Sequence, residues 1–156
     1  MTTARTTLVS LGYEDVASFV NSGNLIFTAS GEPPELEDAI RSVLESTYGF
    51  ELTTFVRTAA QVEALATDKP FGQIAPGHTH FALLPLTPLT AKERRAVEAM
   101  SNERDAVVVR GRDVHWLIRA RSIETSLGPR QWKQALPGNP TTARNVTMIE
   151  RLAAKL

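Results

Sequence analysis

The segment Thr141-Thr142-Ala143-Arg144-Asn145 holds the residue types best suited to bind an anion. It precedes apolar residues at helical spacing, so Thr142 or Asn145 can cap the free N–H groups of a first helical turn. Capping does not account for Arg144, because a cation near a helix N-terminus costs about 0.3–1 kcal/mol. A bound anion would reverse that cost. A salt bridge to a carboxylate in the first half of the chain is the alternative that we favour. Thr141, Thr142, Arg144 and Asn145 remain candidate ligand-binding residues.

Four more basic residues precede this segment and form a candidate basic patch: Arg119, Arg121, Arg130 and Lys133. Basic side chains beside Trp116, Trp132 and His115 could bind nucleic acid, since phosphate contacts and base stacking need these residue types. The basic residues do not form a dense run, however. Trp116 also alternates with apolar neighbours, which is typical of a core position. We therefore do not favour nucleic-acid binding.

The net charge is zero but unevenly distributed. Residues 1–101 contain 7 Lys and Arg against 12 Asp and Glu, a net −5, whereas residues 102–156 contain 10 against 5, a net +5. The basic final part could bind an anion. Mutual attraction between the two parts, or plain solvation of both, explains the asymmetry equally well, and we favour this simpler reading.

The histidines and the absence of cysteine bear on metal sites. His78 and His80 flank Thr79, and alternate residues of a strand face the same way, so the pair could hold a metal ion. The spacing suggests no third ligand, and without cysteine there is no thiolate. We expect ordinary exposed or hydrogen-bonded histidines, with no metal and no other cofactor.

The turn Asn21-Ser22-Gly23-Asn24 joins two apolar runs. Asn and Gly tolerate the positive φ that tight hairpins require, so turn chemistry alone explains these residues. Asn21, Ser22 and Asn24 are candidate ligand contacts only in second place. Ser22 has no base nearby in the sequence, and none of the motifs G-x-S-x-G, P-loop or G-x-G-x-x-G is present. Catalytic residues therefore remain unknown.

Hydrophobic periodicity predicts an α+β protein of two plait-like, ferredoxin-like units with antiparallel sheets and helices on one face. The expected order is helix 1–11, strands 13–20 and 25–28, helix 33–48, strand 50–57 and helix 58–66, then strand 80–84, helix 90–100, strands 106–110 and 114–119, and helices 129–136 and 146–156. The first unit, 1–72, is one strand short of a plait. The second, 73–156, ends in two helices.

Two stretches resemble a bacterial family known as domain of unknown function 1697. LGYEDVASFVNSGNLIFTA is similar to its hairpin signature, in which LGY-x-x-V precedes an aromatic strand and (Q/N)SGN. PTTARNVTMIERLA is similar to its closing TTRN-type segment. With the order of elements, the resemblance extends over nearly the whole chain and implies the same fold. It implies no activity.

This chain departs from the family pattern at three places. Members begin with a strand and a Gly-rich stretch of the type LLRGINVGG, whereas MTTARTTLVSLGY begins in register with a later position. We therefore expect the inner first strand and the glycine loop to be missing. Ser122-Ile123-Glu124-Thr125 stands where relatives tend to have Ser-Lys-Leu-Thr, and Val146 replaces an aromatic residue.

The composition is that of a soluble globular protein, with 42% hydrophobic and 22% charged residues. No apolar run reaches the ~18 residues of a membrane span, so we expect a cytoplasmic protein without membrane contact. The leading hypothesis is a non-catalytic binding module for an anionic ligand or a protein partner. An enzyme with a site between the units, including Arg144, Asn145 and the hairpin turn, is the first alternative, and a nucleic-acid binder is the second. A sheet gap filled by another copy would give a homodimer.

Overall fold

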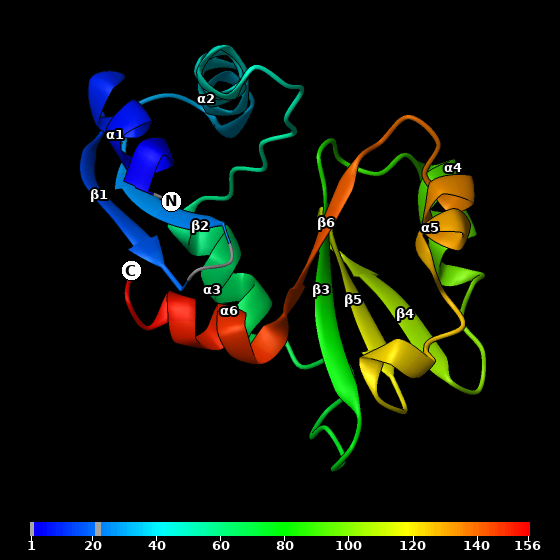
Figure 1. Ribbon diagram of the computed structural model, residues 1–156. Helices are drawn as coiled ribbons and strands as arrows, with labels where there is room; N and C mark the ends of the chain where they lie inside the picture. Colours follow the sequence, from blue (N-terminus) through cyan, green and yellow to red (C-terminus); the bar gives the residue numbers. More distant parts are fainter. Residues whose placement is uncertain (1, 21–22) are drawn as a thin grey trace. The chain divides into compact units, whose positions relative to one another are not determined.

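The computed structural model describes residues 2–20 and 23–156 and contains two compact units (Figure 1). One unit comprises Met1–Thr58 with Leu156, and the other comprises Ala59–Lys155. The described residues form α-helices and two antiparallel sheets, which confirms the predicted α+β class. None of their helices is both long and apolar enough to cross a membrane.

The first unit combines a hairpin with two helices, α1 (Thr2–Ser10) and α2 (Pro33–Tyr48). Strands β1 (Glu14–Phe19) and β2 (Asn24–Thr28) pair antiparallel, as predicted. Leu8, Ile40 and Val56 form the centre of the core. Helix α2 begins at Pro33 and is closed by Gly49 at φ 77°, which confirms both of its predicted ends.

The segment Phe50 to Arg57 is not the predicted strand. It has no regular secondary structure, and no described strand pairs with it. Two backbone N–H groups of this segment donate to carboxylates of α2 instead. Val56 N–H donates to Glu37 Oε1 at 2.8 Å, and Leu52 N–H donates to Glu45 Oε1 at 3.0 Å. These carboxylates satisfy N–H groups that a sheet neighbour would otherwise bind.

The second unit contains a complete β-α-β-β-α-β plait. Its elements are α3 (Ala59–Thr67), β3 (Thr79–Pro85), α4 (Ala91–Glu98), β4 (Asp105–Arg110), β5 (Asp113–Ile118), the 3₁₀ turn η1 (Ser122–Glu124), α5 (Pro129–Ala135), β6 (Thr141–Asn145) and α6 (Val146–Ala153). The four strands lie in the order β4-β5-β3-β6, all antiparallel. This unit is therefore ferredoxin-like. At α4 the predicted capping box is confirmed, because Thr90 and Glu93 each accept the other's backbone N–H.

Thr141 to Asn145 corrects the prediction of a segment that only leads into a helix. It is the fourth strand of the plait, paired with β3 from Phe81↔Asn145 to Pro85↔Thr141. A five-residue strand at a sheet edge needs no apolar alternation, because only one neighbour holds it. For this reason its polar sequence does not look like a strand.

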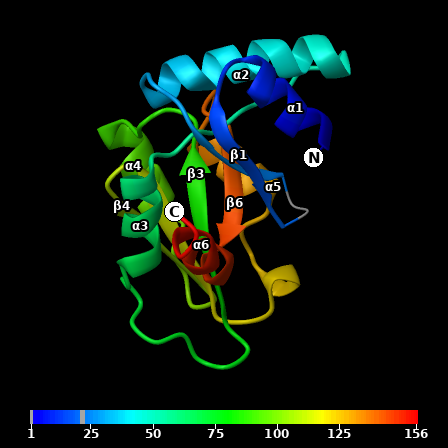
Figure 2. The same cartoon turned by 90° about the vertical axis from the view of Figure 1, so that its left-hand side faces the viewer.

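Helices cover both faces of the four-stranded sheet, and not one face as predicted (Figures 1 and 2). On one face α4 and α5 enclose a core that includes Leu83, Trp116 and Trp132. This confirms Trp116 as a core residue. On the other face α3 and α6 pack over Ala82. The cause lies in the central strands: β5 is buried at every position, so both faces of the sheet need a cover.

The two compact units divide after Thr58, whereas the sequence suggested a boundary at Gly72. Helix α3 accounts for the difference. Its residues Leu65 and Ala66 share one buried cluster with Val146 and Ile149 of α6. Local sequence places α3 beside the first unit, but its apolar face packs in the second.

Candidate functional site

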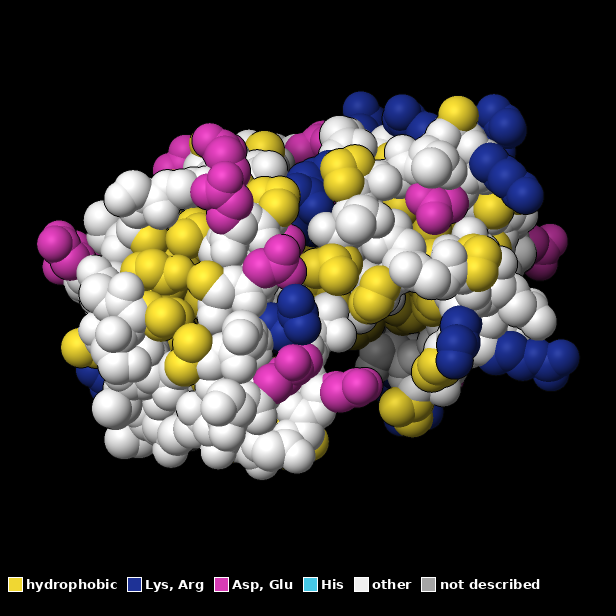
Figure 3. Space-filling model, turned by 90° about the horizontal axis from the view of Figure 1, so that it is seen from above, with side chains coloured by type: hydrophobic (Ala, Val, Ile, Leu, Met, Phe, Trp, Pro, Cys, Tyr) yellow, Lys and Arg dark blue, Asp and Glu magenta, His cyan; other side chains and the backbone are white. Residues whose placement is uncertain are grey.

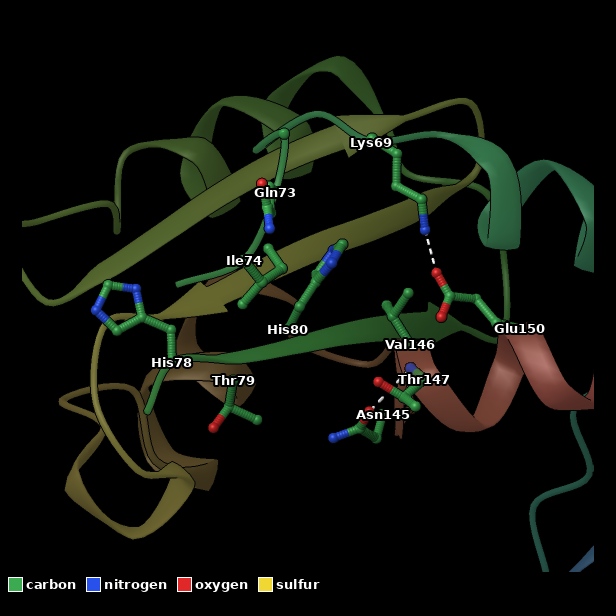
Figure 4. A pocket seen from close by; sticks show the side chains of 11 residues that line it. Lys69, Gln73, Ile74, His78, Thr79, His80, Asn145, Val146, Thr147 and Glu150 are labelled. Carbon is green, nitrogen blue, oxygen red and sulfur yellow. Dashed lines mark hydrogen bonds and ion pairs between the residues drawn. The ribbon is translucent and has the colours of Figure 1, made fainter. Parts of the chain in front are cut away.

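A pocket of about 570 Å³ opens in the second unit on the face covered by α3 and α6. The chain between α3 and β3 and the start of β3 form one wall, with Lys69, Gly72, Gln73, Ile74, His78, Thr79 and His80. The end of β6 and the first turn of α6 form the other, with Asn145, Val146, Thr147 and Glu150. Figure 4 shows Lys69 and Glu150 at one end, His78 at the other and His80 between them.

Two buried histidines meet at this pocket. In the register of β3 and β5, His80 lies opposite Leu117 and His115 opposite Ala82, so the histidines are diagonal neighbours on one face. His80 Nε2 lies 2.9 Å from His115 Nδ1, a hydrogen-bond distance. The second nitrogen of His115, Nε2, lies 3.9 Å from Asp68 Oδ2. His80, His115 and Asp68 thus lie in a row, with His80 at the pocket wall and the Asp68 carboxylate at the far end.

Both imidazoles are poor proton acceptors in this setting. Burial, with the neighbouring His115 and Lys69, lowers the pKa of His80 from 6.5 to about 4. Burial also lowers the pKa of His115, although the Asp68 carboxylate acts in the opposite direction. The pair is therefore uncharged at neutral pH. A proton on His115 Nε2 is favoured by Asp68, which leaves Nδ1 to accept the hydrogen bond from His80 Nε2–H.

The remaining polar groups of the pocket surround the start of α6. Lys69 Nζ forms an ion pair with Glu150 Oε1. Asn145 caps α6, since its Oδ1 accepts the N–H of Thr147 at 2.9 Å. The described residues contain no group of three or more His, Asp and Glu side chains placed to hold a metal ion. Glu150 is the carboxylate of the lining.

The structure separates the residues predicted to act in the segment 141–145. Asn145 lines the pocket and is the helix cap that the sequence suggested. Thr141, Thr142 and Arg144 belong to strand β6 and do not line the pocket. Arg144 Nη1 donates to Thr142 Oγ1 at 2.7 Å and to Ala143 O at 2.9 Å. Burial lowers the pKa of Arg144.

The hairpin residues lie in the first unit. Asn24 pairs with Phe19 across the hairpin, and its side-chain Nδ2 donates to Phe19 O at 3.4 Å. This contact supports the turn. Asn21 and Ser22 fall outside the described residues.

The four residues of the basic patch are exposed, and two of them have acceptors within the protein. Arg119 Nη1 donates to Glu103 O at 3.0 Å, and Arg121 Nε pairs with Glu124 Oε1 at 2.6 Å. Arg130 and Lys133 stand on the short helix α5. In Figure 3 the Lys and Arg side chains on the right-hand part of the molecule stand along its rim, interrupted by uncharged surface. Arg119 also lines a second hollow of about 530 Å³ with Arg104 and Ser126.

The pairing of His80 with His115 was missed from the sequence. The available signal was the presence of histidines in two strands that are otherwise apolar. What the sequence does not supply is the register of β3 against β5, which sets them diagonally across two neighbouring strands. Asp68 and Lys69 follow α3, and only the packing of α3 against α6 brings them to this face.

Sequence comparison identifies the family. Residues 1–115 match the family described as "Protein of unknown function (DUF1697)". The chain belongs to this DUF1697 family. The predicted resemblance is thereby confirmed, and the closing segment PTTARN lies beyond the matched residues. A comparison with curated proteins gave no significant match.

A solved structure supports the DUF1697 fold described above. The chain is similar to a conserved bacterial protein, SP0830 from Streptococcus pneumoniae, with a TM-score of 0.78 and 19% sequence identity. The alignment covers 100% of this chain and 88% of that protein. At this identity the likeness shows a shared fold.

Proposed function

We propose that this DUF1697 protein is a non-catalytic binding module for a small anionic ligand, and that the ligand binds in the pocket between β3 and α6. The observation that carries the proposal is the gathering of donors there. Lys69, Gln73 and His78 line the same pocket as the first turn of α6. The positive end of a helix dipole favours an anion by about 0.3–1 kcal/mol.

The single carboxylate of the pocket does not exclude an anion. Glu150 is held by Lys69, and an ammonium group has three N–H donors, so the pair leaves donors for a ligand. Gln73 and Thr147 add an amide and a hydroxyl group to the lining. These groups can bind the oxygens of a carboxylate or of a tetrahedral oxyanion, which is the ligand chemistry we propose.

The alternatives have weaker support. Nucleic-acid binding at the basic patch would need free guanidinium groups, but Arg119 and Arg121 already bind acceptors within the protein. Acid–base catalysis by His80 would need a pKa near the working pH, whereas burial lowers the pKa of His80 to about 4. An enzyme site that includes Asn21 and Ser22 remains a hypothesis.

Calorimetric titration with sodium sulfate at fixed ionic strength tests the proposal, with sodium acetate as a second arm. Tighter binding of sulfate indicates a tetrahedral oxyanion, and tighter binding of acetate indicates a carboxylate. We expect Lys69→Gln to weaken binding roughly tenfold, because a charged donor is lost. Glu150→Gln should tighten it, because the competing carboxylate is lost.

Lys133→Gln is the matched control. Lys133 is an exposed lysine on α5, outside the pocket lining. Its substitution removes the same net charge and should leave affinity unchanged. Equal weakening by Lys69→Gln and Lys133→Gln, or no binding of either anion to the unmodified protein, would overturn the proposal.

A further inference from the structure

The charges of the pocket leave a bound anion without a counter-charge. Lys69 and Glu150 are joined in an ion pair, so their charges cancel. The neighbouring pair of histidines is uncharged at neutral pH because it is buried. An anion that enters this lining therefore adds negative charge to a neutral, partly desolvated site, which is unfavourable unless a positive charge appears with it.

We infer that the pocket takes up a proton together with its anion, and that the hydrogen-bonded pair His80–His115 accepts this proton; the inference rests on the proposed binding function. His80 lines the pocket, so a charge on its ring would lie beside the ligand. His115 lies behind it at 2.9 Å, and Asp68 lies 3.9 Å beyond His115. A proton shared by the two rings would thus lie between the anion and a carboxylate, and both would stabilise it.

The charged groups around the pair determine how much proton affinity the ligand must add. Lys69 opposes a proton on His80, whereas Glu150 and Asp68 favour it. Around His115, Arg110 opposes a proton and Asp113 favours it. His78 is another imidazole that lines the same pocket. Nearby carboxylates already oppose part of the pKa lowering that burial causes in the two histidines. The negative charge of a ligand would raise these pKa values further, so that the pair can hold a proton.

The test is the number of protons bound with sulfate. Sulfate does not titrate between pH 4 and 8, so protons taken up on binding go to the protein. Calorimetry at pH 6 in two buffers of different ionisation enthalpy gives this number. We expect about one proton per sulfate, and an affinity that falls about tenfold per pH unit between pH 5 and 7. Binding without proton uptake overturns this inference and leaves the proposed function standing. Absence of sulfate binding overturns this inference, and absence of both sulfate and acetate binding overturns the proposed function as well.

Matched variants assign the proton. His80→Gln should abolish the uptake, whereas His78→Gln, which changes another imidazole of the same pocket, should still take up about one proton for each sulfate that it binds. Uptake that persists in His80→Gln, or is lost in a His78→Gln protein that still binds sulfate, overturns the assignment. Because His80→Gln changes a buried site, imidazole ¹⁵N shifts of the unmodified protein provide a second measurement. Sulfate should shift the nitrogens of His80 and His115 towards imidazolium values at pH 6, and unchanged shifts of both rings contradict the inference.

Discussion

His80 Nε2 and His115 Nδ1 lie 2.9 Å apart in the second unit, where His80 is 7% exposed and His115 1%. Two imidazoles this close and this buried favour the neutral state of both. The strands that carry them are central in the plait, so the pair is part of the fold as well as of the pocket.

This relationship predicts how stability depends on pH. The pKa of His80 is about 4 in the folded protein and 6.5 in the unfolded chain, so between these values the unfolded chain binds more protons. The free energy of unfolding should therefore fall as pH decreases from about 6.5 towards 4. The lowered pKa of His115 acts in the same direction. Thermal melts across this range measure the effect.

Carboxylates also titrate near the lower end of that range, so a variant is needed to separate the effect of the histidines on stability from that of the carboxylates. The melting temperature of His80→Gln should decrease less between pH 7 and 5 than that of the unmodified protein. His78→Gln is the control and should follow the unmodified curve. Parallel curves for all three proteins would show that the pair does not govern acid sensitivity.

Substitution of Asp105 should cause a large loss of stability. This buried carboxylate accepts Trp116 Nε1–H at 2.8 Å, Thr125 Oγ1–H at 2.5 Å, and the backbone N–H and the hydroxyl of Ser126. Burial acts to raise the pKa of Asp105, but these hydrogen bonds outweigh it and hold the pKa below its usual value. Asp105→Asn should cost about 2–4 kcal/mol in urea unfolding, because donors are left without their charged acceptor.

The same carboxylate has a defined pH window. The pKa of Asp105 is lowered in the folded protein. Its contribution to the free energy of unfolding is therefore complete above the unfolded pKa of 3.8 and is lost as pH falls through the folded pKa. Glu103→Gln is the control, because Glu103 is an exposed acid two residues before Asp105, just outside β4. An Asp105→Asn protein as stable as Glu103→Gln would contradict the structural role given to these hydrogen bonds.

Gly23 tests the hairpin of the first unit. Its φ is 82°, and a Cβ at this position would meet no atom within 4 Å, so the backbone conformation and not crowding requires glycine. Gly23→Val should destabilise the protein by about 1 kcal/mol or more. Gly23→Asn should cost less, because Asn tolerates positive φ. Equal melting temperatures for the two variants would show that positive φ is not what the turn requires.

Arg119 separates a structural role from a role in phosphate binding. Its guanidinium donates to the carbonyl oxygens of Asn102 and Glu103, at 3.3 and 3.0 Å. Arg119→Ala should therefore lower stability by about 1 kcal/mol and leave salt-dependent retention on heparin unchanged. Arg144→Ala, tested in parallel, should also elute at the same salt concentration. Earlier elution of both variants would instead support a nucleic-acid surface.

The sequence by itself determined the elements whose signals are local. Pro33 and Gly49 bound α2, Thr90 and Glu93 form the capping box of α4, and Asn and Gly mark the hairpin. Backbone stereochemistry and hydrogen bonds within a few residues fix such features, so periodicity and caps are enough to find them. The α+β class and the resemblance to DUF1697 follow from the same kind of information.

Only the tertiary structure decided which side chains meet. Thr141 to Asn145 is a strand because β3 pairs with it, and Phe50 to Arg57 is not one because α2 carboxylates bind its N–H groups. The pocket needs the register of β3 against β5 and the packing of α3 on α6. These are contacts between residues distant in the chain, and their energies come from burial and pairing that no local pattern encodes. For this reason His80 and His115 could be noticed in the sequence, but their hydrogen bond could not.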